Sequence, residues 1–180
     1  MQKSAEIAVI PHVVNTLGLW NSGFVVSLRH AFGTFPEDAY KAWHAAGDWT
    51  DELGKRFLEA YLITLDKKFK LGNTQFVAIE QKPKVVIASM VAQEGIGFKD
   101  GPPIRYEALE ACMKTIGTFV GTMPRMVEIH APKFGSLRSG GNFQVIEEMI
   151  QDLWVASGIT VVIYDFDAKI KISGGQQCER

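Results

Sequence analysis

Hydrophobic residues recur along the chain in two patterns, one typical of buried strands and one typical of amphipathic helices. Residues 7–14 are almost continuously apolar, which is the pattern of a strand in a sheet that is covered on both faces. Residues 24–32 carry apolar side chains at a helical spacing, and Pro36 followed by two acidic residues is typical of the start of another helix. The chain therefore predicts a strand, a loop over residues 15–23, and two helices in succession.

The alternation of apolar runs and amphipathic segments continues through the rest of the chain. Strands that alternate with helices predict a mixed, mostly parallel sheet between helical layers, which is a three-layer α/β/α fold of the α/β class. The polar residues after the last strand predict an irregular tail over residues 168–180. The further predicted strands are 75–80, 85–91, 126–131 and 159–166, and the further predicted helices are 50–68, 104–119 and 142–157, the last with Val145, Ile146, Met149, Ile150 and Leu153 facing the core.

The composition is that of one folded domain, which we expect to span residues 1–167. Hydrophobic residues make up 47% of the 180 residues and charged residues 22%, which supplies one core and argues against long disordered segments. The formal net charge is -1, with 19 basic and 20 acidic side chains. This balance argues against non-specific binding to nucleic acids or membrane surfaces, which usually needs a basic excess.

Neither a signal peptide nor a membrane-spanning segment is expected. The first residues lack a basic region followed by an apolar stretch, and no apolar run reaches the roughly 18 residues that a membrane span needs. Cys112 and Cys178 lack the spacing of metal ligands, so no metal or other cofactor is predicted. Two reduced thiols in a cytoplasmic protein are the favoured interpretation, and a single disulfide is the alternative.

Two glycine-bearing loops each follow a predicted strand and precede a predicted helix. The first loop covers residues 15–23 and the second loop residues 134–141. Glycine lets several backbone N–H groups converge on one point, and the start of a helix adds its own free N–H groups and dipole. Two such loops at the carboxyl edge of a sheet could hold a diphosphate without lysines. The alternative is that both loops only turn the chain, since neither matches the Walker or dinucleotide-binding consensus.

The order and spacing of several motifs resemble those of macrodomains, a family of ADP-ribose-binding modules. The resemblance extends over residues 7–167 and implies the three-layer fold already predicted, with ADP-ribose or an ADP-ribosylated substrate as the ligand. It is nearest to the branch of ADP-ribosyl hydrolases and ADP-ribose-1″-phosphate phosphatases. The matching segments are the first loop with its flanks (12–25), the following helix (36–43), a strand end (88–95), a helix start (103–109), the second loop with its preceding strand end (130–141) and the closing strand (164–166).

The resemblance implies catalytic roles for two residues at the end of the first strand. Asn15 is expected to bind the distal ribose, and its alternative role is to stabilise its own turn. His12 is expected to act as an acid or base, because imidazole titrates near neutral pH, and its alternative is a hydrogen-bonded histidine at a strand end. The ligand-binding residues that the resemblance implies are Gly18, Trp20, Asn21, Ser22, Gly23, Phe24, Gln93, Lys133, Phe134, Gly135, Ser136, Leu137, Arg138, Ser139, Gly140, Gly141 and Phe166.

Four of the ligand-binding candidates have a second interpretation. Trp20 either covers the sugar or anchors the first loop in the core, and Phe166 either stacks on adenine or simply ends a strand. Lys133 and Arg138 either contact phosphate or lie exposed without a ligand. His130, in the strand before the second loop, is interpreted as structural.

The sequence departs from the family pattern at several positions. Asn21 and Leu137 stand where the loops usually carry glycine, so their side chains could crowd the diphosphate or the distal ribose. We do not expect a counterpart of the family's earlier strand, which ends in Gly-Asp and binds adenine, and this leaves adenine selectivity open. Gln93 stands near the lysine nucleophile of some hydrolases, and an amide nitrogen cannot form that adduct. The helix predicted over residues 50–68 looks like an insertion.

These observations lead to three candidate functions. The first is hydrolysis of an ADP-ribose derivative, either the 1″-phosphate or ADP-ribose attached to a protein or nucleic acid. The second is a non-catalytic reader of ADP-ribose, and the third is a diverged scaffold that binds a protein. No membrane partner is expected, and a nucleic acid is expected only as a modified substrate. The oligomeric state is not predicted.

Overall fold

The computed structural model describes residues 5–48, 68–79, 84–123, 126–165 and 169–172. Within these residues, one six-stranded sheet has the order β2-β3-β1-β4-β5-β6. The inner strands β3, β1, β4 and β5 are parallel, and β2 and β6 pair antiparallel at the two edges. The strands are β1 (Ile7–Asn15), β2 (Thr74–Ile79), β3 (Lys84–Gln93), β4 (Val127–Pro132), β5 (Thr160–Tyr164) and β6 (Lys169–Ile172).

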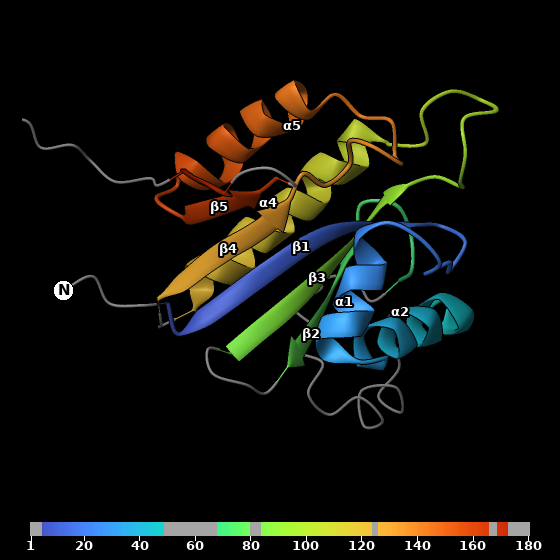
Figure 1. Cartoon of the computed structure of the whole chain (residues 1–180), viewed down its shortest axis with the longest axis horizontal. Helices are drawn as coiled ribbons and strands as arrows, with labels where there is room; N and C mark the ends of the chain where they lie inside the picture. The colour runs from blue at the N-terminus through green and yellow to red at the C-terminus, as the bar shows by residue number, and fades with distance from the viewer. Residues whose placement is uncertain (1–4, 49–67, 80–83, 124–125, 166–168, 173–180) are drawn as a thin grey trace, which may run out of the picture.

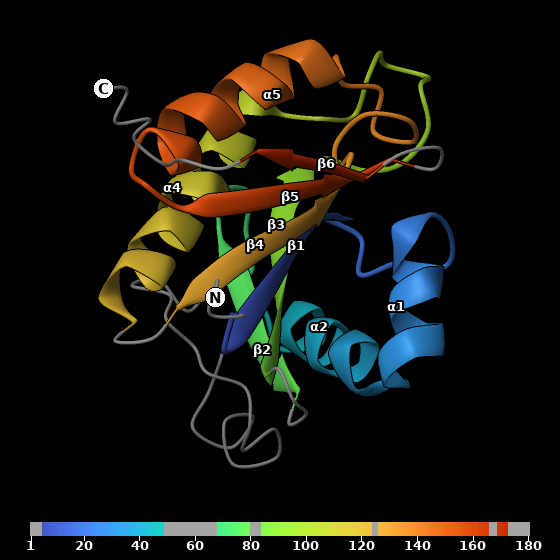
Figure 2. The same cartoon turned by 60° about the vertical axis from the view of Figure 1, so that its left-hand side comes forward.

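Helices cover both faces of the sheet, which confirms the predicted three-layer α/β/α architecture (Figures 1 and 2). α1 (Phe24–Phe32) and α2 (Phe35–Ala46) lie on one face. α4 (Tyr106–Thr122), α5 (Phe143–Ile150) and the π-helical turn η1 (Gln151–Val155) lie on the other. Each helical layer buries its own apolar cluster against the sheet, and this burial is the main driving force for the fold.

The central strand β1 packs against both helical layers and sets the point where the first loop begins. Its apolar residues point alternately into the two clusters, with Val9 packed toward α4 and Val14 toward α1 and α2. β1 pairs with β3 along its whole length, and the register shifts between Val14 and Asn15. Asn15 therefore lies opposite Gln93, so the first loop starts beside the chain that leaves β3.

Two predictions about elements differ from the structure, and a third lies almost entirely outside the described residues. The prediction of an irregular tail over residues 168–180 was wrong for residues 169–172, which form the edge strand β6 against β5. Val145 was predicted to face the core but is exposed, because only a narrow stripe of α5, with Ile146 and Ile150, packs inward. Residues 50–67 of the predicted insertion lie outside the described part of the chain.

Two further observations concern membranes and cysteines. Among the described helices, none combines the length and apolar character that crossing a membrane demands. Cys112 is buried in α4, and burial raises the pKa of its thiol to about 12, which keeps it protonated and unreactive. Cys178 lies outside the described residues.

Candidate functional site

Three loops gather at the carboxyl edge of the parallel strands, where ligands bind in open α/β sheets. They are the first loop after β1, the second loop after β4, and a middle loop (residues 94–103) after β3. The first and second loops touch, because Gly23 lies against the side chain of Arg138. A Cβ atom added to Gly23 would come within 3.3 Å of Arg138 Cδ. The two glycine-bearing loops therefore lie side by side.

Asn15 organises the first loop. Its Oδ1 accepts hydrogen bonds from the backbone N–H groups of Leu17 (2.9 Å) and Leu19 (3.1 Å), and its Nδ2 donates to the carbonyl of Leu19 (2.8 Å). The hydroxyl of Tyr40 on α2 donates to the Asn15 carbonyl at 2.5 Å. Asn15 thus has the turn-stabilising role, and its side-chain oxygen is occupied by the loop itself.

The middle of the first loop is fastened to α2. Trp20 is buried, its indole ring lies 5.4 Å from the ring of Tyr40, and its Nε1–H donates to the carbonyl of Val25 at 3.1 Å. Gly18 has a φ of 71° and lies directly on the ring of His44, so any side chain there would collide with the imidazole. Trp20 and Gly18 therefore hold the shape of the loop through their contacts with α2.

The end of the first loop is open to solvent and leads into α1. Asn21, Ser22, Gly23 and Phe24 are exposed. No side chain caps the N-terminus of α1, where Gly23 is the N-cap residue with a φ of 84°. The first backbone N–H groups of α1 are therefore available to an anion, which the helix dipole also favours.

The glycines of the second loop shape that loop. Gly140 N–H donates to the Ser136 carbonyl at 2.6 Å, and Gly141 N–H donates to the Gly135 carbonyl at 2.9 Å. Gly140 and Gly141 were both predicted to bind the ligand, and in the structure their amides are used inside the loop. Gly140 packs so closely on the ring of Phe98 that an added Cβ atom would overlap it.

Other predicted residues of the second loop differ in how accessible they are. The hydroxyl of Ser136 donates to the Lys133 carbonyl at 2.7 Å, which tightens the turn. Phe134 is buried, with its ring 6.0 Å from Trp154, so its side chain belongs to the core. Leu137 is 83% exposed and projects from the loop.

Gln93 joins the second loop to the middle loop. Its Oε1 accepts a hydrogen bond from Ser139 Oγ at 2.7 Å, and its Nε2 donates to the carbonyl of Gly95 at 3.0 Å. Ser139 is itself buried. Both residues were predicted to bind the ligand, and in the structure their polar groups hold neighbouring loops together.

The two predicted cations have different surroundings. Lys133 forms an ion pair with Asp165, and its Nζ lies 5.3 Å from the centre of the Phe143 ring. Arg138 forms no ion pair with any described residue, and its side chain lies over Gly23 at the start of α1. Arg138 is therefore placed to meet an anion at that helix end.

His12 is enclosed in the protein. Its Nε2 lies 2.9 Å from Ser89 Oγ, and its ring meets the edge of Trp20 at 5.1 Å between centroids. Burial disfavours the charged imidazolium and lowers the pKa of His12 from 6.5 to about 3. The expected acid or base with an ionisation near neutral pH is therefore wrong for His12.

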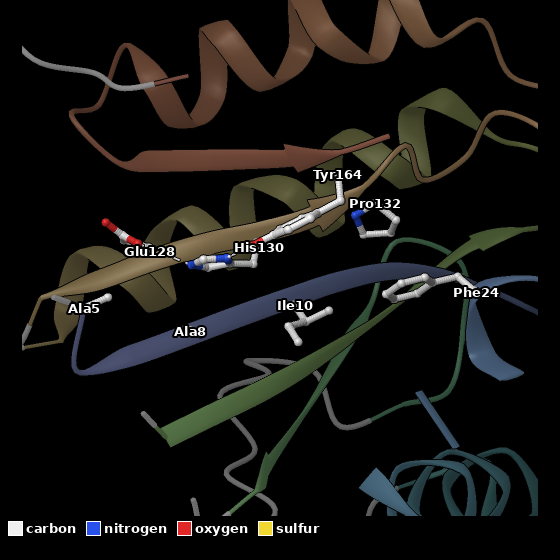
Figure 3. Close-up of a pocket in the computed structure, with 8 residues that line it drawn as sticks. All are labelled: Ala5, Ala8, Ile10, Phe24, Glu128, His130, Pro132 and Tyr164. Carbon is white, nitrogen blue, oxygen red and sulfur yellow. Dashed lines mark hydrogen bonds and ion pairs between the residues drawn. The ribbon is translucent and has the colours of Figure 1, made fainter. Parts of the chain in front are cut away.

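An apolar groove beside the start of α1 was not foreseen from the sequence (Figure 3). Its volume is about 590 Å³, and it follows the face of β1 and β4 from their amino ends to Phe24. The sequence shows only that alternate β4 residues share one face, and the β4–β5 register that adds Tyr164 beside Pro132 is set by the folded sheet. The lining residues are Ala5, Ala8, Ile10, Phe24, Glu128, His130, Pro132 and Tyr164.

Three polar side chains in the groove form a hydrogen-bonded chain (Figure 3). His130 Nδ1 lies 2.8 Å from the hydroxyl of Tyr164, and His130 Nε2 lies 3.3 Å from Glu128 Oε2. The rings of His130 and Tyr164 are stacked, with centroids 5.8 Å apart. This network holds both rings in place as part of the groove wall. Phe166, which was predicted to stack on adenine, lies outside the described residues.

Comparison with known proteins identifies the fold. No model of a known protein family matches the chain, and no curated protein matches it. A protein of unknown function from Bacteroides thetaiotaomicron is similar over 92% of this chain and 91% of its own, with 29% identity and a TM-score of 0.73. A macrodomain protein from Streptomyces coelicolor is similar over 92% and 91%, with 28% identity and a TM-score of 0.66.

A third structure shares the fold at lower identity. Thermosipho africanus DarTG, solved in complex with ADP-ribose, matches 90% of this chain and 39% of its own chain, with 14% identity and a TM-score of 0.58.

Proposed function

We propose that this chain, which is a macrodomain, binds ADP-ribose, free or attached to a carrier. The observation that carries the proposal is the uncapped N-terminus of α1, which lies between Arg138 and the apolar groove. An anion at Gly23 would meet free backbone N–H groups, the positive end of the helix dipole and a guanidinium. The diphosphate of ADP-ribose fits that environment.

The groove supplies a site for the adenosine. Its volume of about 590 Å³ lies within the range of pockets for small molecules, which are mostly apolar with a few polar groups. At the end next to α1, Phe24, Pro132 and Tyr164 offer apolar and aromatic surface to a flat base. A ligand that spans the start of α1 therefore places its base in the groove and its distal ribose toward Asn15.

Hydrolysis of the bound derivative is the second candidate function. The observation that favours it is Asn15, which lies at the end of β1 and keeps one amide hydrogen beyond the one donated to Leu19. That hydrogen could orient a ribose hydroxyl or a water molecule. Because burial keeps His12 neutral and Gln93 is tied to Ser139, turnover would proceed through water without either residue as a reacting group.

Calorimetric titration of the full chain with ADP-ribose tests the binding proposal. We expect one ligand per chain, and no comparable heat with free ribose, which lacks the diphosphate and the base. Absence of binding at millimolar ADP-ribose would leave the scaffold interpretation.

A separate incubation of the protein with each ADP-ribose derivative distinguishes a reader from a hydrolase. Release of phosphate from ADP-ribose-1″-phosphate, or of ADP-ribose from a modified protein or nucleic acid, would establish catalysis. Binding without either release would establish a reader.

A further inference from the structure

Exposed apolar side chains gather at the tips of the three loops that surround the proposed site. Among the described residues, these are Leu17 and Leu19 in the first loop, Ile96 and Phe98 in the middle loop, and Leu137 in the second loop. Figures 1 and 2 show all three loops at the same end of the sheet. Large apolar side chains collected at one place on a surface mark an interaction site, whereas scattered ones need no explanation.

The bases of the three loops are joined, so the apolar tips belong to one platform. Thr16 N–H donates to the carbonyl of Gln93 at 2.9 Å, and Gly95 N–H donates to Thr16 Oγ1 at 3.0 Å. Ser139 Oγ donates to Gln93 Oε1, and Ile104 N–H donates to the Ser139 carbonyl at 3.1 Å. A partner that meets these tips therefore finds them already ordered, which lowers the entropy cost of binding.

The charge of the platform decides what kind of partner it fits. The three loops contain two cations, Lys99 and Arg138, and two anions, Glu94 and Asp100, so their sum is zero. Glu94 also pairs with Arg105 at 2.8 Å, which removes that cation from use by a ligand. Nucleic acids require several lysines or arginines along their phosphates, and the three loops supply only two.

We propose that the carrier of the ADP-ribose is a protein, and that apolar residues next to its modified side chain pack on Leu17, Ile96 and Leu137. This inference rests on the proposed function, because the ADP-ribose would anchor the carrier at the site. Burial of the exposed tips then adds affinity that free ADP-ribose does not gain.

The test compares carriers on the full chain. Affinity is measured for free ADP-ribose, for a short peptide with ADP-ribose on one serine between leucine and phenylalanine residues, for the same peptide unmodified, and for single-stranded DNA with one ADP-ribose on a base. The variant Leu17→Ser/Ile96→Ser removes two tips that are 48% and 59% exposed. Met126→Ser is the matched control, since Met126 is 45% exposed just before β4, away from the loops.

We expect the wild type to bind the modified peptide about tenfold more tightly than free ADP-ribose, which is the scale for burying one or two apolar side chains. The double variant should lose that gain and retain its affinity for free ADP-ribose, and Met126→Ser should keep both. Three outcomes would overturn the inference alone. They are equal affinity for the modified peptide and free ADP-ribose, tighter binding of the modified DNA than of the modified peptide, and a gain in affinity that persists in the double variant. No binding of free ADP-ribose would overturn the proposed function and the inference together.

Discussion

His12 lies in the middle of β1, with its ring enclosed by Ser89, Trp20 and Phe24. The sequence predicted that His12 belongs to the first strand but placed it at the strand end, and the protonation of the ring depends on neighbours that are brought together by folding. Its pKa in the folded state is about 3, below the ordinary value of 6.5 that applies to the unfolded chain. The unfolded state therefore binds a proton more readily than the folded state throughout the interval between these values.

A dependence of stability on pH follows from this difference. As the pH falls below 6.5 toward 3, the contribution of His12 to the free energy of unfolding should be lost progressively, by about 2 kcal/mol at pH 5. Denaturant unfolding of the wild type and of His12→Gln between pH 7 and pH 4 measures this loss. The free energy of unfolding should depend less on pH in the variant than in the wild type. His30→Gln, at an exposed histidine of α1, is the control and should follow the wild type. An unchanged slope in His12→Gln would contradict the buried neutral imidazole.

Arg138 supplies the second prediction at the residue scale. Replacing Arg138 with Gln should weaken ADP-ribose binding about fivefold to tenfold, because one exposed charge-assisted contact contributes roughly 1 kcal/mol. Lys114→Gln on α4 removes the same charge at a distant, exposed position, where Lys114 pairs with Glu110 at 2.6 Å. That variant should bind like the wild type in the same titration. Equal weakening in both would point to a general effect of net charge.

At the scale of elements, the second loop and the middle loop depend on each other through Gly140 and Phe98. Gly140 has a φ of 69° and lies against the ring of Phe98, whereas Gly97 has a φ of 78° and nothing within 4 Å of an added Cβ atom. The two glycines therefore share the backbone conformation and differ in their contacts. This pair separates the cost of backbone strain from the cost of overlap.

We expect Gly97→Ala to lower the free energy of unfolding by roughly 1 kcal/mol, and Gly140→Ala to lower it by a further 1–3 kcal/mol. Gly140→Ala should also weaken ADP-ribose binding, because the second loop carries Arg138. Chemical denaturation and titration of both variants measure these effects. Adding Phe98→Ala to Gly140→Ala should recover part of the lost stability, and no recovery would show that the overlap does not set the cost.

At the scale of the whole molecule, the proposed ligand would contact segments from several parts of the chain. The start of α1, the second loop and the groove on β1 and β4 come together only in the folded protein. ADP-ribose at about one hundred times its dissociation constant should therefore stabilise the fold by roughly 2.7 kcal/mol. For a domain of this size, thermal unfolding should shift upward by about 5–10 °C. No shift at saturating ADP-ribose would contradict binding to the folded state.

The order of the elements and the place of the loops could be read from the amino-acid sequence alone. Continuous apolar runs such as residues 7–14 can be buried only between two helical layers, so the fold class follows from local pattern and hydrophobic burial. The two glycine-bearing loops were found because each joins a strand to a helix. The alternation Lys-Ile-Lys-Ile of β6 was also a strand signal, although the polar residues around it hid it.

The contacts of the individual candidate residues could be read only from the folded chain. Whether an amide of Gly140 points at a ligand or into its own loop depends on backbone angles that residue type leaves open. Gln93 and Ser139 are 46 positions apart, so their hydrogen bond is invisible to any local pattern. The groove likewise exists only because β4 and β1 are paired in the folded sheet. The local sequence sets the spacing of apolar residues and hence the type of each element. The accessibility and the partners of a polar group depend on contacts between distant segments.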